Sequence, residues 1–167
     1  MTQLHLRSRR TLALVGVTLL GLIGATSTSL AGGAGAPSRA TSSQTLTFDV
    51  VTSPFHLVDV GDKGVSVGDQ TVFDDLLFKN GKRVGFDSGA CTVTRVAMNE
   101  RDPFRVSCVA TYALPGGTIA AQGVMTNNPT KVLAIVGGTG AYEGAHGQIT
   151  FVEFGNGKGS VTINVHR

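Results

Sequence analysis

The feature that most limits the fold is a succession of short runs in which apolar and polar residues alternate. Glycine, proline, asparagine or aspartate ends each run, and no helical period is visible from residue 44 onward. Alternation with period two predicts strands with one buried face. Asn80-Gly81 and Asn156-Gly157 are dipeptides that favour tight hairpins. The expected strands are 44–52, 55–60, 69–78, 83–98, 104–114, 118–126, 131–136, 146–154 and 160–165.

Evenly spaced short strands without helices predict an all-β sandwich or barrel. Gly85 and Gly89 lie inside one long predicted strand, where glycine indicates a bend of the kind found at a barrel corner. A closed barrel of about eight strands has room for one small ligand in its interior. The first functional expectation is therefore a ligand site inside the barrel.

The first 36 residues are predicted to be a secretory signal peptide. Arg7, Arg9 and Arg10 precede an apolar run over 11–25, and small residues with candidate cleavage sites follow it. The run is short for a membrane span, which needs about 20 residues; an uncleaved N-terminal anchor is the alternative. The expected organisation is a signal (1–36), a flexible lead-in (37–43) and one domain (44–167), secreted and without stable membrane insertion after cleavage.

The charge balance argues against a nucleic-acid partner. The chain has 14 Lys and Arg and 11 Asp and Glu, and three of the arginines lie in the leader. The remaining 11 basic residues balance the 11 acidic ones, so the expected mature chain is formally neutral. No basic cluster interleaved with aromatic residues is present, which leaves no electrostatic footprint for nucleic acid.

The only two cysteines, Cys91 and Cys108, are expected to form a disulfide. They lie in consecutive predicted strands, and a hairpin centred between Asn99 and Glu100 places them opposite each other. An even pair in an exported chain usually closes. The alternative is a reactive thiol near His56 or His146.

A glycine-rich stretch, 137–147, follows the apolar run 132–136 and invites comparison with a phosphate-binding loop. Such a loop requires a helix after the glycines. Here residues 148–154 alternate with period two instead, and the glycine spacing does not fit the dinucleotide pattern. The stretch is therefore predicted to be a connection between two strands.

Several polar residues fall within predicted strands. Asp74 and Asp75 are adjacent, so they point to opposite faces and at most one faces inward. Asp49, Tyr112 and Glu153 are also carried by strands, together with Arg95; for each alone, a solvated outer face is the simpler expectation.

The order of motifs resembles the allene oxide cyclase barrel family. The motifs are Gly68-Asp69-Gln70-Thr71-Val72-Phe73, Asn80-Gly81-Lys82-Arg83-Val84-Gly85, Ser88-Gly89-Ala90-Cys91, Gln122-Gly123 and the stretch 136–147. The glycine-rich hairpin also resembles dirigent proteins of the same superfamily. The resemblance implies an all-β fold, an eight-stranded antiparallel β-barrel with a central apolar cavity. It also implies no cofactor, no metal and the possibility of a homo-trimer.

The resemblance also implies site residues. Asp49 matches an acidic cavity residue and Ser53-Pro54 matches a pair that holds an ordered water. Asp75 falls where the cyclases carry an Asn, and Met125 replaces a Tyr. Cys91 matches a cavity cysteine, whereas Cys108 has no counterpart. Asp49 and Asp75 are accordingly the candidate catalytic residues, and the candidate substrate-binding residues are Ser53, Pro54, Cys91, Tyr112 and Met125.

Three functions follow as hypotheses. The first is a cofactor-free cyclase or isomerase that binds a reactive, largely apolar small molecule and steers its cyclisation by orientation and placed polar groups. The second is a non-catalytic, secreted, lipocalin-like binding protein. The third is a structural or interaction protein whose barrel is filled with side chains. The volume of the cavity and the groups that face it distinguish them.

Overall fold

The computed structural model describes residues 42–54, 56–99 and 102–167. The predicted signal peptide and nearly all of the lead-in lie outside these residues. Within them, no helix is both long and apolar enough to cross a membrane.

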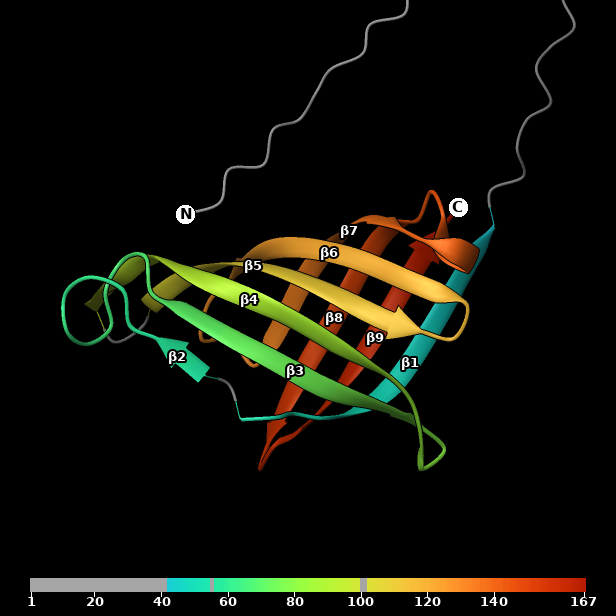
Figure 1. Ribbon diagram of the computed structural model, residues 1–167, viewed down its shortest axis with the longest axis horizontal. Helices are drawn as coiled ribbons and strands as arrows, with labels where there is room; N and C mark the ends of the chain where they lie inside the picture. The colour runs from blue at the N-terminus through green and yellow to red at the C-terminus, as the bar shows by residue number, and fades with distance from the viewer. Residues whose placement is uncertain (1–41, 55, 100–101) are drawn as a thin grey trace, which may run out of the picture. The chain divides into compact units, whose positions relative to one another are not determined.

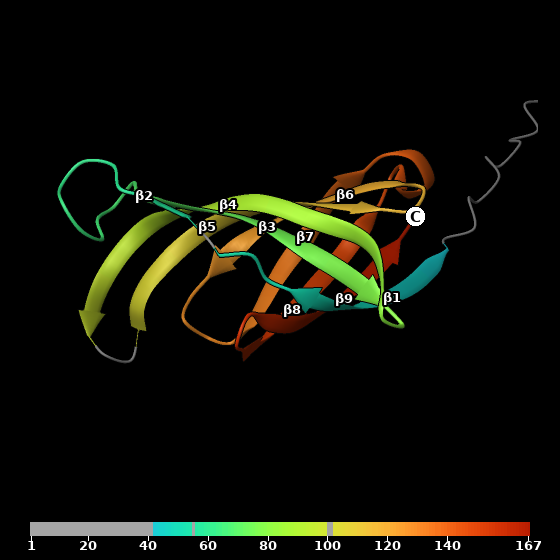
Figure 2. The ribbon, with the colours of Figure 1, turned by 60° about the horizontal axis from the view of Figure 1, so that its bottom comes forward.

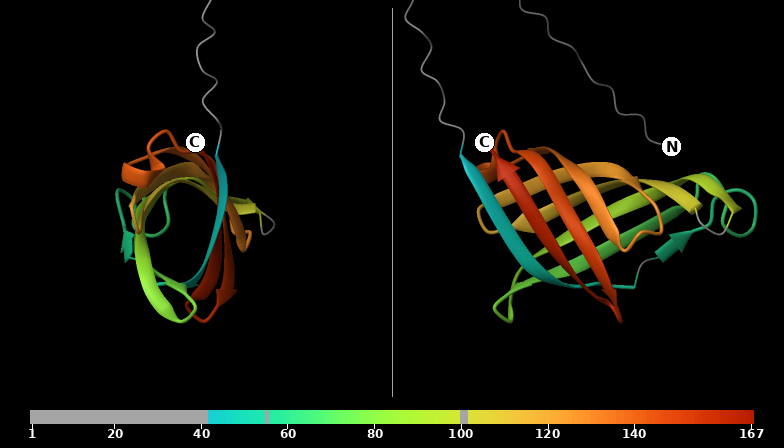
Figure 3. Two further views of the ribbon diagram at one scale, coloured as in Figure 1. Left: turned by 90° about the vertical axis from the view of Figure 1, so that its right-hand side faces the viewer. Right: turned by 180° about the vertical axis from the view of Figure 1, so that it is seen from behind.

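The described chain is built from strands joined almost entirely in sequence order. They are β1 (Ser43–Val51), β2 (His56–Val58), β3 (Gln70–Lys79), β4 (Lys82–Asn99), β5 (Asp102–Leu114), β6 (Gly117–Met125), β7 (Thr130–Gly138), β8 (His146–Gly155) and β9 (Lys158–His166). All pairings are antiparallel, and β1 pairs with both β9 and β3. Strand β1 and strands β3 to β9 thus form a closed eight-stranded barrel (Figure 1; Figure 3, left), while β2 extends the edge of β3.

The predicted fold class is confirmed, and so are all nine predicted strands, with boundaries that differ by a few residues. The largest difference is β2, which has only three residues. It ends because the backbone N–H of Val60 turns to the side chain of Asp69, at 2.8 Å, and leaves the sheet.

The alternation in sequence becomes alternation in burial. On β9, Val161, Ile163 and Val165 are buried while the residues between them are only partly buried. Leu77 and Ile119 are fully buried. Burying a side chain of this size contributes about 1.5–3 kcal/mol, so the inward aliphatic residues supply much of the drive to close the barrel.

The β3–β4 hairpin turns at the predicted Asn80-Gly81 dipeptide, where both residues have positive φ, 52° and 71°. This is the backbone that two-residue hairpins prefer. A bulge between Leu77 and Phe78 then shifts the pairing by one residue. Its consequence for the interior is described below.

The glycine-rich stretch connects two strands, as predicted. Strand β7 ends at Gly138, a short 3₁₀ turn η1 covers Gly140–Tyr142, and β8 begins at His146. Gly140 has a φ of 59°, and a Cβ there would lie 2.3 Å from the carbonyl oxygen of Gly116. Glycine is thus required by both conformation and space.

The two glycines of β4 mark close contact with the neighbouring strand. A Cβ at Gly85 would lie 2.2 Å from the Ala113 carbonyl oxygen, and one at Gly89 would lie 2.3 Å from that of Val109. Strand β4 curves along its length (Figure 2).

The predicted disulfide is confirmed. Cys91 and Cys108 are direct partners in the β4–β5 register, and their sulfur atoms are bonded. The alternative of a reactive thiol is therefore wrong. A disulfide is typical of proteins that fold in an oxidising compartment, which agrees with an extracytoplasmic location.

Candidate functional site

A cavity of about 720 Å³ lies within the barrel. Exposed residues of the β6–β7 turn and of the β8–β9 hairpin surround its mouth. Its wall is mostly apolar: Phe73, Cys91, Phe104, Val106, Ala110, Met125, Leu133 and Phe151. Both the volume and the composition are those of a site for a small organic molecule. The hypothesis of a barrel filled with side chains is accordingly disfavoured.

Three polar side chains lie side by side in this wall. Asp75 of β3 pairs with Asp87 of β4, and Asp87 pairs with Tyr112 of β5. All three are buried, with 8%, 2% and 3% of their surface exposed, and all three line the cavity. Directly paired residues share a face of the sheet, so the two carboxyls and the phenol form one polar row.

Asp75 is held from one side by the segment between β1 and β2. The backbone N–H of Ser53 donates to its Oδ1 at 2.9 Å, and the Ser53 hydroxyl oxygen accepts from the backbone N–H of Asp74 at 3.2 Å. Asp74 is exposed. The prediction that at most one of these adjacent aspartates faces inward is therefore confirmed.

Burial dominates the electrostatics of the row. It raises the pKa of Asp87 to about 8, with further contributions from the charges of Asp75 and Asp74. Burial also raises the pKa of Asp75, although the Ser53 backbone N–H opposes this. The pKa of Tyr112 is raised by burial and by Asp87. At neutral pH the row therefore holds a neutral phenol and at least one protonated carboxyl.

A third buried aspartate, Asp69, provides a contrast. Its carboxylate accepts from the backbone N–H of Val60 at 2.8 Å and from that of Ser66 at 2.7 Å, and these bonds lower its pKa. It lies outside the cavity wall. Asp69 therefore orders the loop before β3, whereas no described residue hydrogen-bonds to the Asp87 carboxyl. A buried acid that lines a cavity and has a raised pKa is a candidate functional group.

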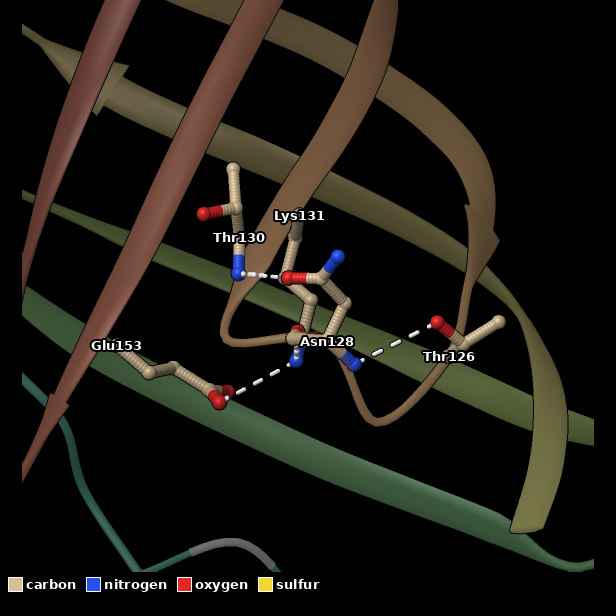
Figure 4. Close-up of polar contacts among 5 residues, drawn as sticks. All are labelled: Thr126, Asn128, Thr130, Lys131 and Glu153. Carbon is tan, nitrogen blue, oxygen red and sulfur yellow. Dashed lines mark hydrogen bonds and ion pairs between the residues drawn. The ribbon is translucent and has the colours of Figure 1, made fainter. Parts of the chain in front are cut away.

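A second polar group lies at the mouth of the cavity. Lys131 of β7 forms an ion pair with Glu153 of β8, with 3.2 Å between Nζ and Oε2 (Figure 4). The Lys131 ammonium also donates to the carbonyl oxygen of Asn128. Leu133 and Ile135, which share the face of Lys131 on β7, are buried, so this lysine projects toward the interior.

Most of the residues predicted for the site do meet in the cavity. Asp75, Ser53, Cys91, Tyr112 and Met125 all line it. Their catalytic and substrate-binding roles stay predictions.

Asp49 and Pro54 do not line the cavity. Asp49 is exposed between the buried Phe48 and Val50, so its side chain lies on the outer face of β1. Pro54 borders a separate groove of about 680 Å³, which also involves Asp74 and Phe86. Neither residue is placed to line this cavity, and their predicted roles stay predictions.

The sequence analysis missed Asp87 and Lys131 and assigned Glu153 to the outer face. A signal for Asp87 was present, since it lies four residues before Cys91 and shares its face in a strand. For Lys131 the same alternation with Leu133 and Ile135 was available. Among the described residues, no three His, Cys, Asp or Glu side chains gather as a metal site.

Comparison with known proteins agrees with this geometry. Residues 44–165 match the family described as the allene oxide cyclase barrel like domain. The chain belongs to this family. A search of curated protein sequences found no match.

Solved structures place this member of the allene oxide cyclase barrel-like family beside several small-molecule proteins. A protein named pyocyanin demethylase is 32% identical, with a TM-score of 0.65, over 73% of this chain and 99% of that one. A pterocarpan synthase dirigent protein is 24% identical, with a TM-score of 0.54, over 77% and 86%. An exo-specific intermolecular Diels–Alderase is 15% identical, with a TM-score of 0.60, over 75% and 99%.

The last two comparisons establish the shared fold alone. The names of all three proteins denote enzymes or proteins of small-molecule synthesis or breakdown. The predicted relationship to allene oxide cyclases and dirigent proteins is thereby confirmed.

Proposed function

We propose that this barrel binds a reactive, largely apolar small molecule in its cavity and steers its cyclisation or isomerisation through proton transfer. Asp87 acts as the proton donor and Asp75 as the proton acceptor. Tyr112 holds the reacting polar atom by a hydrogen bond. No cofactor is part of the proposal.

The observation that carries the proposal is the pairing of Asp75 with Asp87 in an apolar wall. Two carboxyls at one site separate into an acid and a base when their surroundings differ. Asp75 accepts a backbone hydrogen bond that favours its ionised form, whereas Asp87 has none among the described residues and a pKa of about 8. Burial raises the pKa of both carboxyls, and the Ser53 N–H opposes this only at Asp75, so Asp87 is the better proton donor of the pair.

The proposed reaction needs little beyond these groups. The apolar wall holds the substrate in one conformation and excludes water, so that binding places the reacting atoms in the geometry that the reaction needs. Asp87 protonates an oxygen or nitrogen of the substrate as charge develops there. Asp75 removes a proton from the neighbouring atom, or stabilises a transient positive charge.

The test is a product analysis by mass spectrometry. The purified protein is incubated with a fatty-acid-derived allene oxide generated in situ and with a panel of apolar epoxides and polyenes. A product of unchanged mass and altered retention, absent with Asp87→Asn and Asp75→Asn, is expected. A panel returned unchanged by a protein that binds it would replace the proposal with the lipocalin-like binding function.

A second candidate function is demethylation of a heteroaromatic compound. The 32% identity to the protein named pyocyanin demethylase over almost all of that chain favours it. Incubation with pyocyanin distinguishes the two, because demethylation lowers the mass of the product by one CH₂, whereas isomerisation leaves it unchanged.

We also propose that the protein is exported, with residues 1–36 as its signal. The leader pattern and the disulfide support this. Mass determination of the protein recovered from the culture medium of an expressing bacterium, with its N-terminus sequenced, tests both the export and the cleavage position.

A further inference from the structure

We propose that Lys131 is an anchor for an acidic group of the ligand at the mouth of the cavity. The ligand class is then an apolar molecule that carries a carboxylate or phenolate at one end. This inference rests on the proposed function, because it concerns the molecule that enters the same cavity.

The turn that presents Lys131 is fixed by its own side chains. The Asn128 side-chain oxygen accepts from the backbone N–H of Thr130 at 2.9 Å, and the Thr126 hydroxyl accepts from the backbone N–H of Asn128 at 3.4 Å (Figure 4). The backbone N–H of Glu153 donates to the Pro129 carbonyl oxygen at 2.9 Å. These bonds hold the turn, and with it the Asn128 carbonyl that Lys131 contacts, against β8.

The two members of the Lys131–Glu153 ion pair differ in how far their side chains are buried. The side chain of Lys131 is 11% exposed, whereas that of Glu153 is 50% exposed. Glu153 can turn to water at small cost, but Lys131 would lose its counter-charge in a partly buried place. A carboxylate that arrives with a ligand can replace that of Glu153 and restore the pair.

The ammonium also retains capacity for a further bond. It has three donor hydrogens, and within the described residues its partners are the Asn128 carbonyl and Glu153. The third hydrogen suits an acceptor on a bound molecule.

The exposure of the cavity groups sets the direction of the ligand. Asp87 and Tyr112 are almost fully covered, whereas Glu153 at the mouth is half exposed. An acidic group would meet carboxyls if it entered first, and it meets an ammonium if it stays at the mouth. The apolar body then lies against the aromatic and aliphatic wall and reaches Asp75 and Asp87.

Two probes of the same shape test the anchor. Phenazine-1-carboxylate is anionic at neutral pH, and phenazine-1-carboxamide is its neutral counterpart. Binding of each to the purified protein is measured by fluorescence quenching or calorimetry. The wild type is expected to bind the carboxylate about tenfold more tightly than the amide, as a charge-assisted bond allows.

Three variants complete the test. Lys131→Met keeps an unbranched side chain of similar length without the charge, and it is expected to abolish the preference while binding of the amide is unchanged. Glu153→Gln removes the competing carboxylate and is expected to tighten binding of the carboxylate probe. Lys79→Met, an exposed lysine outside the cavity, is the matched control and should retain the preference.

The outcomes separate the two proposals. Equal binding of the two probes by the wild type, or a preference that survives in Lys131→Met, overturns the anchor and leaves the proposed function standing. Failure of both probes to bind overturns the anchor together with a cavity function for planar aromatic molecules.

Discussion

Asp87 differs from the other buried acids in the number of hydrogen bonds that its carboxyl accepts. Asp69 accepts two backbone N–H bonds and Asp75 accepts one, whereas no described residue donates to Asp87. A buried carboxyl without donors stays protonated, because the charged form cannot be solvated. Raised pKa values of this kind are commonly found at functional sites.

Asp87→Asn should lower turnover at least about 100-fold, the usual contribution of a general acid, while substrate binding is retained. The rate of the wild type should fall as pH rises through about 8, where Asp87 loses its proton. Steady-state kinetics across pH, with circular dichroism to confirm folding, measure both effects. A variant with full activity and the same alkaline limb would remove Asp87 from the mechanism.

The same substitution should change how stability depends on pH. Burial raises the pKa of Asp87 in the folded state to about 8 from its ordinary value of 3.8, so between these values the folded chain binds a proton that the unfolded chain has lost. The free energy of unfolding should therefore decrease as pH rises across this window. Urea unfolding at about pH 5, 7 and 9 should show this decrease in the wild type and a flatter profile in Asp87→Asn. Parallel profiles for the two proteins would contradict the raised pKa.

The β3–β4 hairpin determines which residues meet in the wall. A two-residue turn at Asn80-Gly81, continued without interruption, pairs Asp75 with Phe86. The bulge inserts Val84 as an extra residue and pairs Asp75 with Asp87 instead. One unpaired residue in a strand therefore brings two acids together that the simple register would separate.

Gly89 allows strand β4 to approach β5 closely, because it has no side chain. A Cβ there would lie 2.3 Å from the Val109 carbonyl oxygen and 2.7 Å from the Phe73 ring. Gly89→Ala should lower the free energy of unfolding by about 1–3 kcal/mol, the range for overpacking a tight site. Ser88→Ala, at the neighbouring position on the same strand, serves as the control. If urea denaturation gave both variants the free energy of unfolding of the wild type, strands β4 and β5 would be able to move apart at this position without cost.

Closure of the barrel makes the cavity a property of the entire domain. Strand β1 pairs along its length with β9 and by three residues with β3, and these pairings close the continuous sheet from β3 to β9 into a barrel. The polar row and the Lys131–Glu153 pair then border the same space, although 44 residues of sequence separate Asp87 from Lys131. The volume and the polar groups together favour a binding cavity over a solid core.

Filling this space should abolish binding and leave the fold intact. Ala110 is buried in the cavity wall, and its neighbour Val109 is 57% exposed on the outer face. Ala110→Phe should weaken binding of any cavity ligand more than tenfold, since the added ring occupies the site. Val109→Phe adds a ring to the other face of the same strand and should bind normally. Equal affinities for the two variants would place the ligand elsewhere.

Much of the fold was predictable because its signals are local. Alternation placed nine strands, two Asn-Gly dipeptides placed two hairpins, and the spacing of Cys91 and Cys108 about a turn gave the disulfide. Alternation also indicates that Asp49 faces outward, since Phe48 and Val50 flank it. The exposure of Asp49 in the structure agrees with this pattern, whereas its role implied by the family resemblance stays a prediction.

The chemistry of the cavity depended on contacts that no local pattern encodes. The alternation of residues determines the two faces of each strand. A bulge in β4 determines that Asp75 pairs with Asp87. Closure of the barrel brings Lys131 and Glu153 to the mouth of the cavity that Asp87 lines. The raised pKa of Asp87 likewise arises from burial by strands distant in sequence. Strand formation reflects neighbours along the chain, whereas register, closure and desolvation reflect packing in space, and the candidate site is made from the latter.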